Sequence, residues 1–363
     1  MEFCPHCMKP AAGKFCGNCG GDMNWKAPPG QLPVGTQLRG NGSVYSVGAA
    51  KGQGGFGITY AAMDLKTCQR VAVKEYFPSR CAVRNNTTYV RPMTKMEDVF
   101  MGGRKSFLEE AMMLRAVCAL PSVVSVRDYF EANGTAYIVM EYVDGKPLNK
   151  HVAKNGPMSP EELLPKLPQL LSDLHIMHGA RVIHRDISPD NLILMPDGRL
   201  KLLDFGAARS VQDGKSMTVM LKAGFSPVEQ YQSKGQGAYT DVYALAATIY
   251  YCLTGTIPEA AINRLGKERD PLLSPNLRGA RLSGQQEKAL LWGMHIQPKM
   301  RPQTMKAFAD ALFPGRKKDD DNDGGGGGTV TGNKTLLIAA VVAGGIVVLA
   351  LLILLIMAIS GAL

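Results

Sequence analysis

The spacing of apolar positions divides the middle of the chain into short strands and helices. Runs of apolar and β-branched residues predict strands at 44–47, 58–60, 70–74 and 137–140. One helical face is predicted by positions three and four residues apart, namely Phe107, Glu110, Leu114 and Val117. Residues 192–203 predict a hairpin that turns at Pro196-Asp197-Gly198.

A longer apolar run, residues 336–359, contains no charged residue. A helix rises 1.5 Å per residue, so this run would extend roughly 36 Å, and about 20 residues suffice to cross a bilayer. The alternative, a buried core helix, rarely reaches this length. We therefore expect a single transmembrane helix over 336–359.

The charges near this run predict its orientation. Lys334 and the run Arg316-Lys317-Lys318 precede it, and Lys and Arg favour the cytoplasmic side of a membrane. We therefore expect a single-pass, membrane-anchored protein of the cell membrane with its main domain in the cytoplasm. The start of the chain predicts no secretory signal. Ala340 and Gly344 form a small-xxx-small pair that would permit a homodimer.

Composition changes this picture little. The chain of 363 residues has 20% charged and 45% hydrophobic residues, as in an ordinary globular protein, and a formal net charge of +10. The Lys and Arg residues are dispersed instead of forming a stripe, so no nucleic-acid binding is expected. Attraction to an anionic inner membrane surface fits this charge better.

Four cysteines near the start have the spacing of a metal site: Cys4, Cys7, Cys16 and Cys19. Two C-x₂-C pairs supply four thiolates, which is the ligand set of a tetrahedral structural Zn²⁺. The segment has hardly any apolar residues, so metal binding would supply its folding free energy. We expect a zinc ribbon over residues 1–20. His6 is an alternative ligand, but the four cysteines already complete the coordination.

Two alternatives compete with zinc. Disulfides are disfavoured in a cytoplasmic protein, and a redox C-x₂-C pair would need a strand–helix context that the sequence lacks. The remaining cysteines are scattered and are expected to be plain buried or half-exposed thiols: Cys68, Cys81, Cys118 and Cys252.

Two stretches have the composition of linkers. Residues 21–36 are rich in Pro, Gly and Gln and predict a semi-rigid linker. Residues 315–335 hold an aspartate run and five consecutive glycines, which predict a flexible tether. One large domain of residues 37–314 remains between them.

A glycine-rich turn follows the first strand and comprises Gly52, Gly54, Gly55, Phe56 and Gly57. Backbone amides of such a turn can approach phosphates because no side chain intervenes. A dinucleotide-binding fold would need a helix directly after the glycines, whereas a strand follows here. The turn therefore predicts a hairpin lid over a nucleotide.

Lys74 ends the strand 70–74, where an unpaired ammonium group would be costly to bury. Such a lysine needs the phosphates of a nucleotide and a carboxylate as partners. We favour Glu110, on the predicted helical face, and Glu109 is the alternative carboxylate.

Three residues further along the chain carry the reaction chemistry. Asp186, in His184-Arg185-Asp186, can accept the proton of a hydroxyl group. Asn191 and Asp204 supply oxygen ligands for Mg²⁺ or Mn²⁺, and the hairpin between them brings its two ends together. Together with Lys74, these residues predict a site that binds ATP and transfers its terminal phosphate.

The set and order of these motifs resemble the bacterial Hanks-type, eukaryotic-like serine/threonine protein kinases over about residues 37–313. The resemblance implies an α+β protein-kinase fold of two lobes, a small β-rich lobe with one main helix and a larger helical lobe. It implies transfer of the γ-phosphate of ATP to Ser and Thr hydroxyls of protein substrates in signalling. The cysteine pairs are similar to the short zinc ribbons at the start of many bacterial regulatory proteins.

Further positions take roles by this resemblance. Glu141 and Val143 fall in the crossover between the lobes, where backbone groups read the adenine edge. Glu229 and Arg301 match a buried ion pair that carbohydrate and antibiotic phosphotransferases would not be expected to carry. Asp241 resembles an aspartate that braces the catalytic loop from a helix below.

Four residues depart from the family pattern. Ser188 stands where most serine/threonine members have a lysine that touches the transferring phosphate, so transfer should be slower. Lys222 lies near the position where a threonine often meets the substrate. Thr59 replaces a valine above the adenine ring. Val228, directly before Glu229, replaces a proline. The alternative to an active enzyme is a catalytically weak or silent pseudokinase that acts as a membrane-tethered zinc-ribbon scaffold.

Two hydroxyl residues, Ser216 and Thr218, lie between Phe205 and Glu229. A phosphate on either one could pair with Arg185 and order the segment. We expect autophosphorylation there, and the alternative is that both are plain loop residues.

Overall fold

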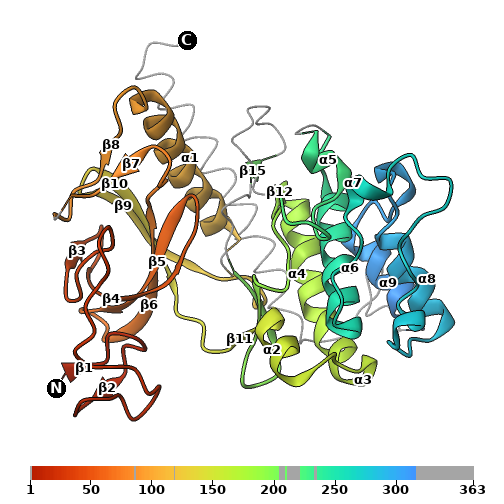
Figure 1. Cartoon of the computed structure of the whole chain (residues 1–363), viewed down its shortest axis with the longest axis horizontal. Coiled ribbons are helices and arrows are strands. Elements are labelled where there is room, and N and C mark those ends of the chain that lie inside the picture. Colours follow the sequence, from red (N-terminus) through yellow and green to blue (C-terminus); the bar gives the residue numbers. More distant parts are fainter. Residues whose placement is uncertain are drawn as a thin grey trace, which may run out of the picture.

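The computed structural model of the chain describes residues 2–85, 87–117, 119–203, 209–210, 221–232 and 235–315. Within these residues, a small lobe of antiparallel strands with one long helix is followed by a larger lobe of helices (Figure 1). The two-lobed α+β arrangement that the resemblance implied is thereby confirmed.

A six-stranded antiparallel sheet forms the small lobe, in the order β3-β4-β5-β6-β10-β9. Its strands are β3 (Gln37–Arg39), β4 (Val44–Gln53), β5 (Gly57–Asp64), β6 (Gln69–Tyr76), β9 (Val126–Ala132) and β10 (Thr135–Glu141). The four predicted strands lie inside these elements, and most of their apolar side chains are buried, as at Ile58, Val73 and Val139. Strand β6 pairs with β5 on one side and β10 on the other, so its residues are held by two ladders.

One long helix, α1 (Glu97–Ala116), packs against β9 and β10. The predicted helical face is buried and comprises Phe107, Glu110, Leu114 and Val117. The rings of Phe100 and Phe107 lie 5.3 and 5.6 Å from the ring of Tyr76, at the end of β6. These aromatic contacts anchor α1 to the strand that carries Lys74.

A buried ion pair stabilises the connection between β6 and α1. The connection contains a small hairpin of β7 (Ala82–Val83) and β8 (Arg91–Pro92). Directly after β7, Arg84 pairs with Glu75 of β6, and both side chains are buried. The same carboxylate accepts hydrogen bonds from the hydroxyls of Tyr60 and Tyr137 at 3.1 and 2.8 Å. The connection between β6 and α1 therefore also stabilises the sheet through Glu75.

The N-terminal residues pack directly on the small-lobe sheet. Strands β1 (Glu2–Phe3) and β2 (Pro10–Ala11) pair antiparallel. The amide of Ala49 in β4 donates to the carbonyl oxygen of Pro5 at 2.7 Å. Met8 is buried against Ala61 and Met63 of β5. The segment is therefore attached to the hairpin that ends in the glycine-rich turn.

The proline-rich stretch 21–36 also contacts this lobe. Leu32 is fully buried, and its amide donates to the hydroxyl of Tyr60 at 3.0 Å. The guanidinium of Arg84 donates to the carbonyl oxygen of Gly30 at 2.9 Å. The stretch thus connects the N-terminal segment to the sheet while packing on it.

The large lobe is built around one central helix. Its helices are α2 (Leu148–Asn155), α3 (Pro160–Leu163), α4 (Leu167–Gly179), α5 (Val228–Tyr231), α6 (Ala238–Thr254), α7 (Ala261–Arg264), α8 (Gly284–Gly293) and α9 (Met305–Leu312). Helix α6 packs against α8 and α9 (Figure 1). It is apolar along most of its length, with Leu245 and Ile249 in the core. A helix that is apolar on most sides is expected at the centre of a helical lobe.

Short strands lie where the two lobes meet. Strands β11 (Lys146–Pro147), β13 (Leu192–Leu194) and β14 (Leu200–Leu202) form one sheet, and β12 (Val182–Ile183) pairs with β15 (Arg209–Ser210). The predicted hairpin over 192–203 is confirmed by the antiparallel pairing of β13 and β14.

A buried ion pair joins α5 to the segment before α9. The guanidinium of Arg301 contacts both oxygens of Glu229, at 2.7 and 3.1 Å, and both side chains are almost completely buried. Thr240 donates to the same carboxylate at 3.0 Å, and the ring of Tyr243 lies 4.9 Å below the guanidinium. The pair that the resemblance implied is therefore confirmed.

Some predicted features lie outside the described residues, namely the tether from residue 316 on, the run 336–359 and Cys118. Among the helices that the structure describes, none combines the length and apolar composition needed to cross a membrane. Of the other scattered cysteines, Cys81 and Cys252 are buried and Cys68 is exposed, as expected of plain thiols.

Replacing Glu229 by Gln should destabilise the large lobe. The substitution leaves the buried charge of Arg301 without its counter-charge, which costs about 3–5 kcal/mol of the free energy of unfolding. Urea unfolding followed by circular dichroism measures this loss. The control is Asp310→Asn, which removes an exposed pair with Lys306 at 3.7 Å and should cost less than about 0.5 kcal/mol. Equal losses in the two variants would contradict the assigned role.

Candidate active site and cysteine cluster

One buried carboxylate fixes the backbone of the catalytic loop, which comprises residues 184–191. Asp241, in the first turn of α6, is fully buried and accepts hydrogen bonds from the amides of His184 and Arg185, each at 2.8 Å. Nε2 of His178, in the last turn of α4, lies 2.8 Å from the same carboxylate. Burial alone would raise the pKa of Asp241, but these hydrogen bonds and the nearby histidines lower it. The ionised carboxylate thus stabilises the loop, although Arg185 has a left-handed φ of 66°. The brace that the resemblance implied is confirmed.

The buried ring of His184 links this loop to the end of β14. Its Nδ1 accepts the amide of Asp186 at 3.2 Å, so Nε2 carries the proton and donates to the carbonyl oxygen of Leu203 at 3.1 Å. The amide of Leu203 in turn donates to the carbonyl oxygen of Asn191 at 2.8 Å. Leu203 directly precedes Asp204, which lies outside the described residues, as do Phe205 and Gly206.

Asp186 and Asn191 are brought together, five residues apart. The amide nitrogen of Asn191 donates to the carbonyl oxygen of Asp186 at 2.8 Å and to its Oδ2 at 2.9 Å. Because the nitrogen is engaged in this way, the amide oxygen of Asn191 is the atom that a magnesium ion would take as a ligand.

A lysine from a distant segment enters this site. Nζ of Lys222 lies 2.9 Å from Oδ1 of Asp186 and 3.7 Å from Asp190, and it donates to Oγ of Ser188 at 2.8 Å. The motifs of the sequence did not predict this contact. Two signals could have indicated it: a small hydroxyl residue where a lysine is expected, and a lysine where a threonine is expected.

Lys74 and Glu110 are both placed in the interior of the small lobe. Lys74 lies in β6 opposite Thr59 of β5 and Ile138 of β10, and its exposed fraction is 9%. Glu110 has an exposed fraction of 8% and lies on the face of α1 that packs on the sheet. Its position makes Glu110 suitable as the carboxylate that accompanies Lys74.

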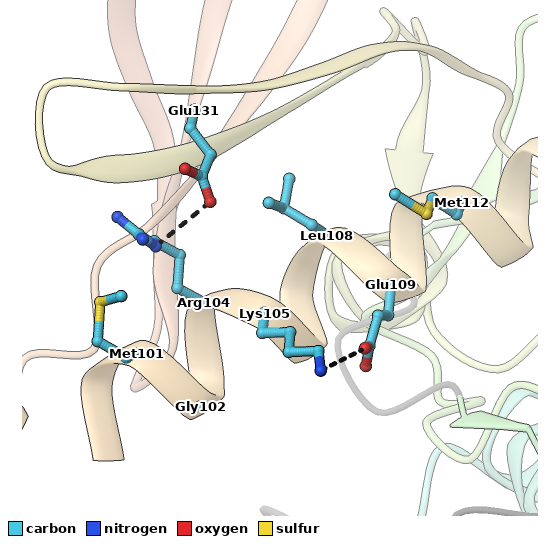
Figure 2. A pocket seen from close by; sticks show the side chains of 8 residues that line it. All are labelled: Met101, Gly102, Arg104, Lys105, Leu108, Glu109, Met112 and Glu131. Atoms are coloured by element: carbon cyan, nitrogen blue, oxygen red, sulfur yellow. Dashed lines mark ion pairs between the residues drawn. The ribbon is translucent and has the colours of Figure 1, made fainter. Parts of the chain in front are cut away.

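The alternative carboxylate, Glu109, lies on the outer face of α1. Its side chain is 52% exposed and pairs with Lys105 at 3.8 Å (Figure 2). Both residues line a hollow between α1 and β9, where Arg104 also pairs with Glu131 at 3.5 Å (Figure 2). This hollow faces away from Glu110, so Glu109 is poorly placed to reach a nucleotide bound near Lys74.

The glycine-rich turn closes the β4–β5 hairpin. The amide of Gly54 donates to the carbonyl oxygen of Gly57 at 2.9 Å. A Cβ atom on Gly57 would lie 2.2 Å from the carbonyl oxygen of Glu75, so this close approach of two strands requires glycine. A Cβ atom on Gly52 or Gly54 would meet no described atom within 4 Å. The carbonyl oxygen of Phe56 accepts a hydrogen bond from the amide of Phe77 at 3.1 Å, which connects the turn to the end of β6. Gly55 lies at the tip, between β4 and β5.

The crossover between the lobes is anchored by a partly buried ion pair. Glu141, the last residue of β10, accepts the amide of Ser125 at 2.8 Å and pairs with Lys201 of β14 at 2.7 Å. Val143 packs on the hydrophobic core at the start of the crossover. These contacts connect the small lobe to the hairpin that follows the catalytic loop.

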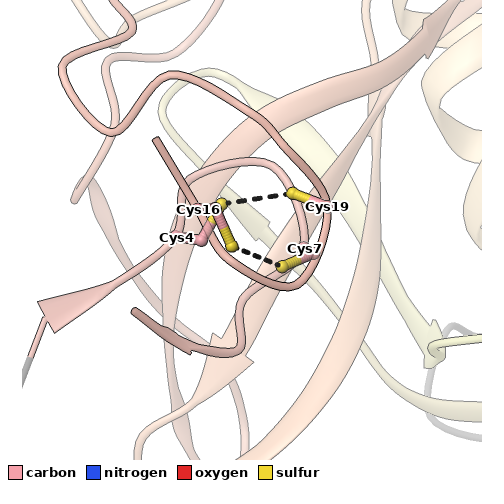
Figure 3. A group of neighbouring side chains, drawn as sticks. All are labelled: Cys4, Cys7, Cys16 and Cys19. Carbon is pink, nitrogen blue, oxygen red and sulfur yellow. Dashed lines mark hydrogen bonds between the residues drawn. The ribbon is translucent and has the colours of Figure 1, made fainter. Parts of the chain in front are cut away.

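The four N-terminal cysteines form one cluster (Figure 3). Their sulfur atoms all lie within 4.8 Å of one another, with 3.6 Å between Cys4 and Cys19 and 3.7 Å between Cys7 and Cys16. These cysteines are free thiols, not disulfides. A tetrahedron with metal–sulfur bonds of about 2.3 Å has sulfur–sulfur edges of about 3.8 Å, so the observed spacing fits a zinc ion.

Backbone amides point at two of these sulfur atoms. The amide of His6 donates to Sγ of Cys4, and the amide of Asn18 donates to Sγ of Cys16, both at 3.4 Å. Burial raises the pKa of the Cys7 thiol to about 12. Burial opposes ionisation of Cys16 as well, but hydrogen bonds from the amides of Asn18 and Cys19 lower its pKa to about 6. Donors of this kind stabilise the thiolate form that binds metal.

Comparison with known proteins agrees with this geometry. Residues 45–308 match the family model of the protein kinase domain. The chain is 33% identical over 270 residues to the serine/threonine-protein kinase B of Synechocystis sp. This alignment covers 70% of this chain and 42% of that protein. It is 30% identical over 273 residues to the serine/threonine-protein kinase PknB of Mycobacterium tuberculosis. That alignment covers 72% of this chain and 41% of that protein. The chain thus spans about two fifths of the length of these relatives.

A solved structure, described as the apo form of PpkA-294, has the same fold. It superimposes with a TM-score of 0.67 and 30% sequence identity, covering 78% of this chain and 100% of that one. The domain match, the serine/threonine kinase relatives and the shared fold all agree with the predicted enzyme class. The chain belongs to the protein kinase domain family.

Proposed function

We propose that this protein transfers the γ-phosphate of ATP to Ser or Thr hydroxyls of protein substrates. The observation that carries the proposal is the carboxylate of Asp186, held by Asn191 at 2.9 Å in a loop that the buried Asp241 braces. The names of the relatives support serine and threonine as the acceptors.

In the proposed reaction, the hydroxyl oxygen of the substrate forms a bond to the γ-phosphorus. The bond from that phosphorus to the oxygen bridging the β-phosphate breaks, and its electron pair leaves with ADP. Asp186 accepts the hydroxyl proton. Lys74, oriented by Glu110, binds the phosphates, and the amides of the glycine-rich turn cover them. Asn191 and Asp204 would hold Mg²⁺ or Mn²⁺, which neutralises phosphate charge when bound.

A silent scaffold would need none of these groups. The chain keeps a proton acceptor at Asp186, a metal ligand at Asn191 and a buried lysine at Lys74. Its named relatives are kinases, and nothing in the described residues favours the pseudokinase alternative. We therefore propose an active enzyme.

Asp186→Asn should lower the transfer rate by about 10²–10⁴-fold, because a positioned proton acceptor contributes that much. The measurement is incorporation of labelled phosphate into a generic protein substrate with ATP and Mg²⁺. Asp197→Asn is the matched control, since Asp197 lies in the exposed turn between β13 and β14 and pairs with Arg199. The control should keep the wild-type rate. Equal labelling by wild type and Asp186→Asn would rule out the enzymatic proposal.

The N-terminal cluster is proposed to bind one structural Zn²⁺ through Cys4, Cys7, Cys16 and Cys19. The sulfur spacing and the amide donors described above support this assignment. When bound, the metal cross-links the two C-x₂-C turns of a segment that has hardly any core of its own.

Metal analysis of the purified chain should find about one zinc per chain, released by a thiol-reactive mercurial. Cys16→Ser should abolish stoichiometric zinc because a tetrahedral site then lacks one thiolate. Cys68→Ser is the control, since Cys68 is exposed and outside the cluster. Protein prepared with zinc and without chelators that still contains no zinc would refute the site.

The remaining proposals concern residues outside the described part of the chain. We propose that residues 336–359 anchor the protein in the cell membrane with the kinase domain in the cytoplasm, as the charge pattern predicts. Cell fractionation tests this: the full chain should sediment with membranes, and a version truncated after Gly315 should not. Recovery of the full chain in the soluble fraction would contradict the anchor.

Pairing into a homodimer through 336–359 should appear as cross-linked dimers that Gly344→Leu abolishes.

Ser216 and Thr218 are proposed sites of autophosphorylation, and a phosphate there would pair with Arg185. Phosphopeptide mapping of the purified protein after incubation with ATP should find modification in this segment, and Asp186→Asn should abolish it. Unmodified Ser216 and Thr218 in the active wild-type protein would end this proposal.

A further inference from the structure

Lys222 brings a positive charge to the proton acceptor from outside the catalytic loop. Its Nζ lies 2.9 Å from Oδ1 of Asp186, while Oδ2 of the same carboxylate accepts from Asn191 at 2.9 Å. Because both carboxylate oxygens are engaged, the plane of the carboxylate is fixed. The ammonium group also donates to Oγ of Ser188 at 2.8 Å, so it lies across the loop and not merely at its edge.

The segment that carries Lys222 is attached to the loop without the lysine side chain. The amides of Phe225 and Ser226 donate to the carbonyl oxygen of Lys222 at 3.0 and 2.9 Å, and its own amide donates to Oγ of Ser226 at 3.0 Å. The side chain of Gln230 donates to the carbonyl oxygen of Arg185 at 2.6 Å. The first three hydrogen bonds shape the segment itself, and that of Gln230 attaches it to the loop, so the ammonium group of Lys222 is not its sole described attachment.

Ser188 and Lys222 behave as one polar pair. Ser188 is fully buried, and its small hydroxyl leaves space for the ammonium group of Lys222. A lysine at position 188 would bring a second ammonium to the same carboxylate, which is costly in a partly buried site. The chain therefore carries a cation at one of the two positions, and here it is Lys222.

We propose that Lys222 is a positioning residue of the transfer reaction, which replaces the cation that is absent at Ser188. It holds Asp186 in the orientation that accepts the hydroxyl proton. It also screens the negative charge of Asp186 from the phosphates, which stabilises the charge distribution of the transition state. The inference rests on the proposed function, because it assigns a role within that reaction.

The test compares steady-state kinetics of the full chain with those of Lys222→Gln, which keeps polarity and most of the length but removes the charge. We expect kcat to fall by about 10²-fold, with the KM for ATP changed by less than about threefold, because Lys222 acts on Asp186 and not on ATP binding. Lys222→Arg should keep at least about a tenth of the wild-type kcat, because it restores the cation. Lys306→Met is the control, since Lys306 is exposed on α9 and should be neutral.

An exchange of the two residues gives a second, independent measurement. The double variant Ser188→Lys/Lys222→Ser places the cation on the loop and the hydroxyl opposite it. It should exceed the kcat of Lys222→Gln by about tenfold or more, because it restores a cation beside Asp186. Thermal unfolding and binding of a fluorescent ATP analogue verify that each variant is folded, and Lys222→Met substitutes for Lys222→Gln if the latter does not fold.

Two results would overturn the inference while leaving the proposed function intact. One is an active wild type with a neutral variant at position 222 whose kcat stays within about twofold of it. The other is a loss of kcat in folded, ATP-binding variants that neither arginine nor the exchange restores, which would indicate a structural role. An inactive wild type would instead refute the proposed function, and this inference with it.

Discussion

The catalytic loop depends on a carboxylate that is shielded from water. A buried charge is costly unless it is fully hydrogen-bonded, and Asp241 meets this condition with the amides of the loop itself. The amides of the loop therefore compensate for the burial of Asp241, and the carboxylate of Asp241 in turn holds the loop in place. Its neighbour Thr240 binds the carboxylate of Glu229, which Arg301 neutralises. Two adjacent residues of α6 thus connect the buried carboxylate of Asp241 with the buried pair of Glu229 and Arg301.

The features that the sequence predicted are mostly local ones. Strands, the α1 face and the 192–203 hairpin follow from periodicity, because burial of one face imposes a repeat on neighbouring residues. Asp186 and Asn191 are five residues apart in one loop, so their hydrogen bond required only a short turn. The cysteine cluster is similar, since two short turns bring four thiols within 4.8 Å of one another.

The features that the sequence did not reveal are contacts between distant segments. Lys222 meets Asp186 through side chains from separate parts of the chain, and no periodicity encodes that meeting. The pair of Arg84 and Glu75 was hidden in a stretch that reads as a polar loop. The burial of Met8 on β5 was equally unforeseen, because the composition of the N-terminal segment indicates only a metal site. Each of these contacts forms only when the chain packs into its fold, so the sequence alone does not show it.

The hydrogen bonds between α6 and the catalytic loop have a consequence for folding during translation. The amide of His184 binds a carboxylate 57 residues further along the chain, and Glu229 binds a guanidinium 72 residues further along. A ribosome releases the loop well before these partners have been translated. The loop therefore acquires its working shape only when α6 has left the exit tunnel and packed. The arrangement of Asp186 and Asn191 is in this sense one of the last features that the nascent polypeptide gains.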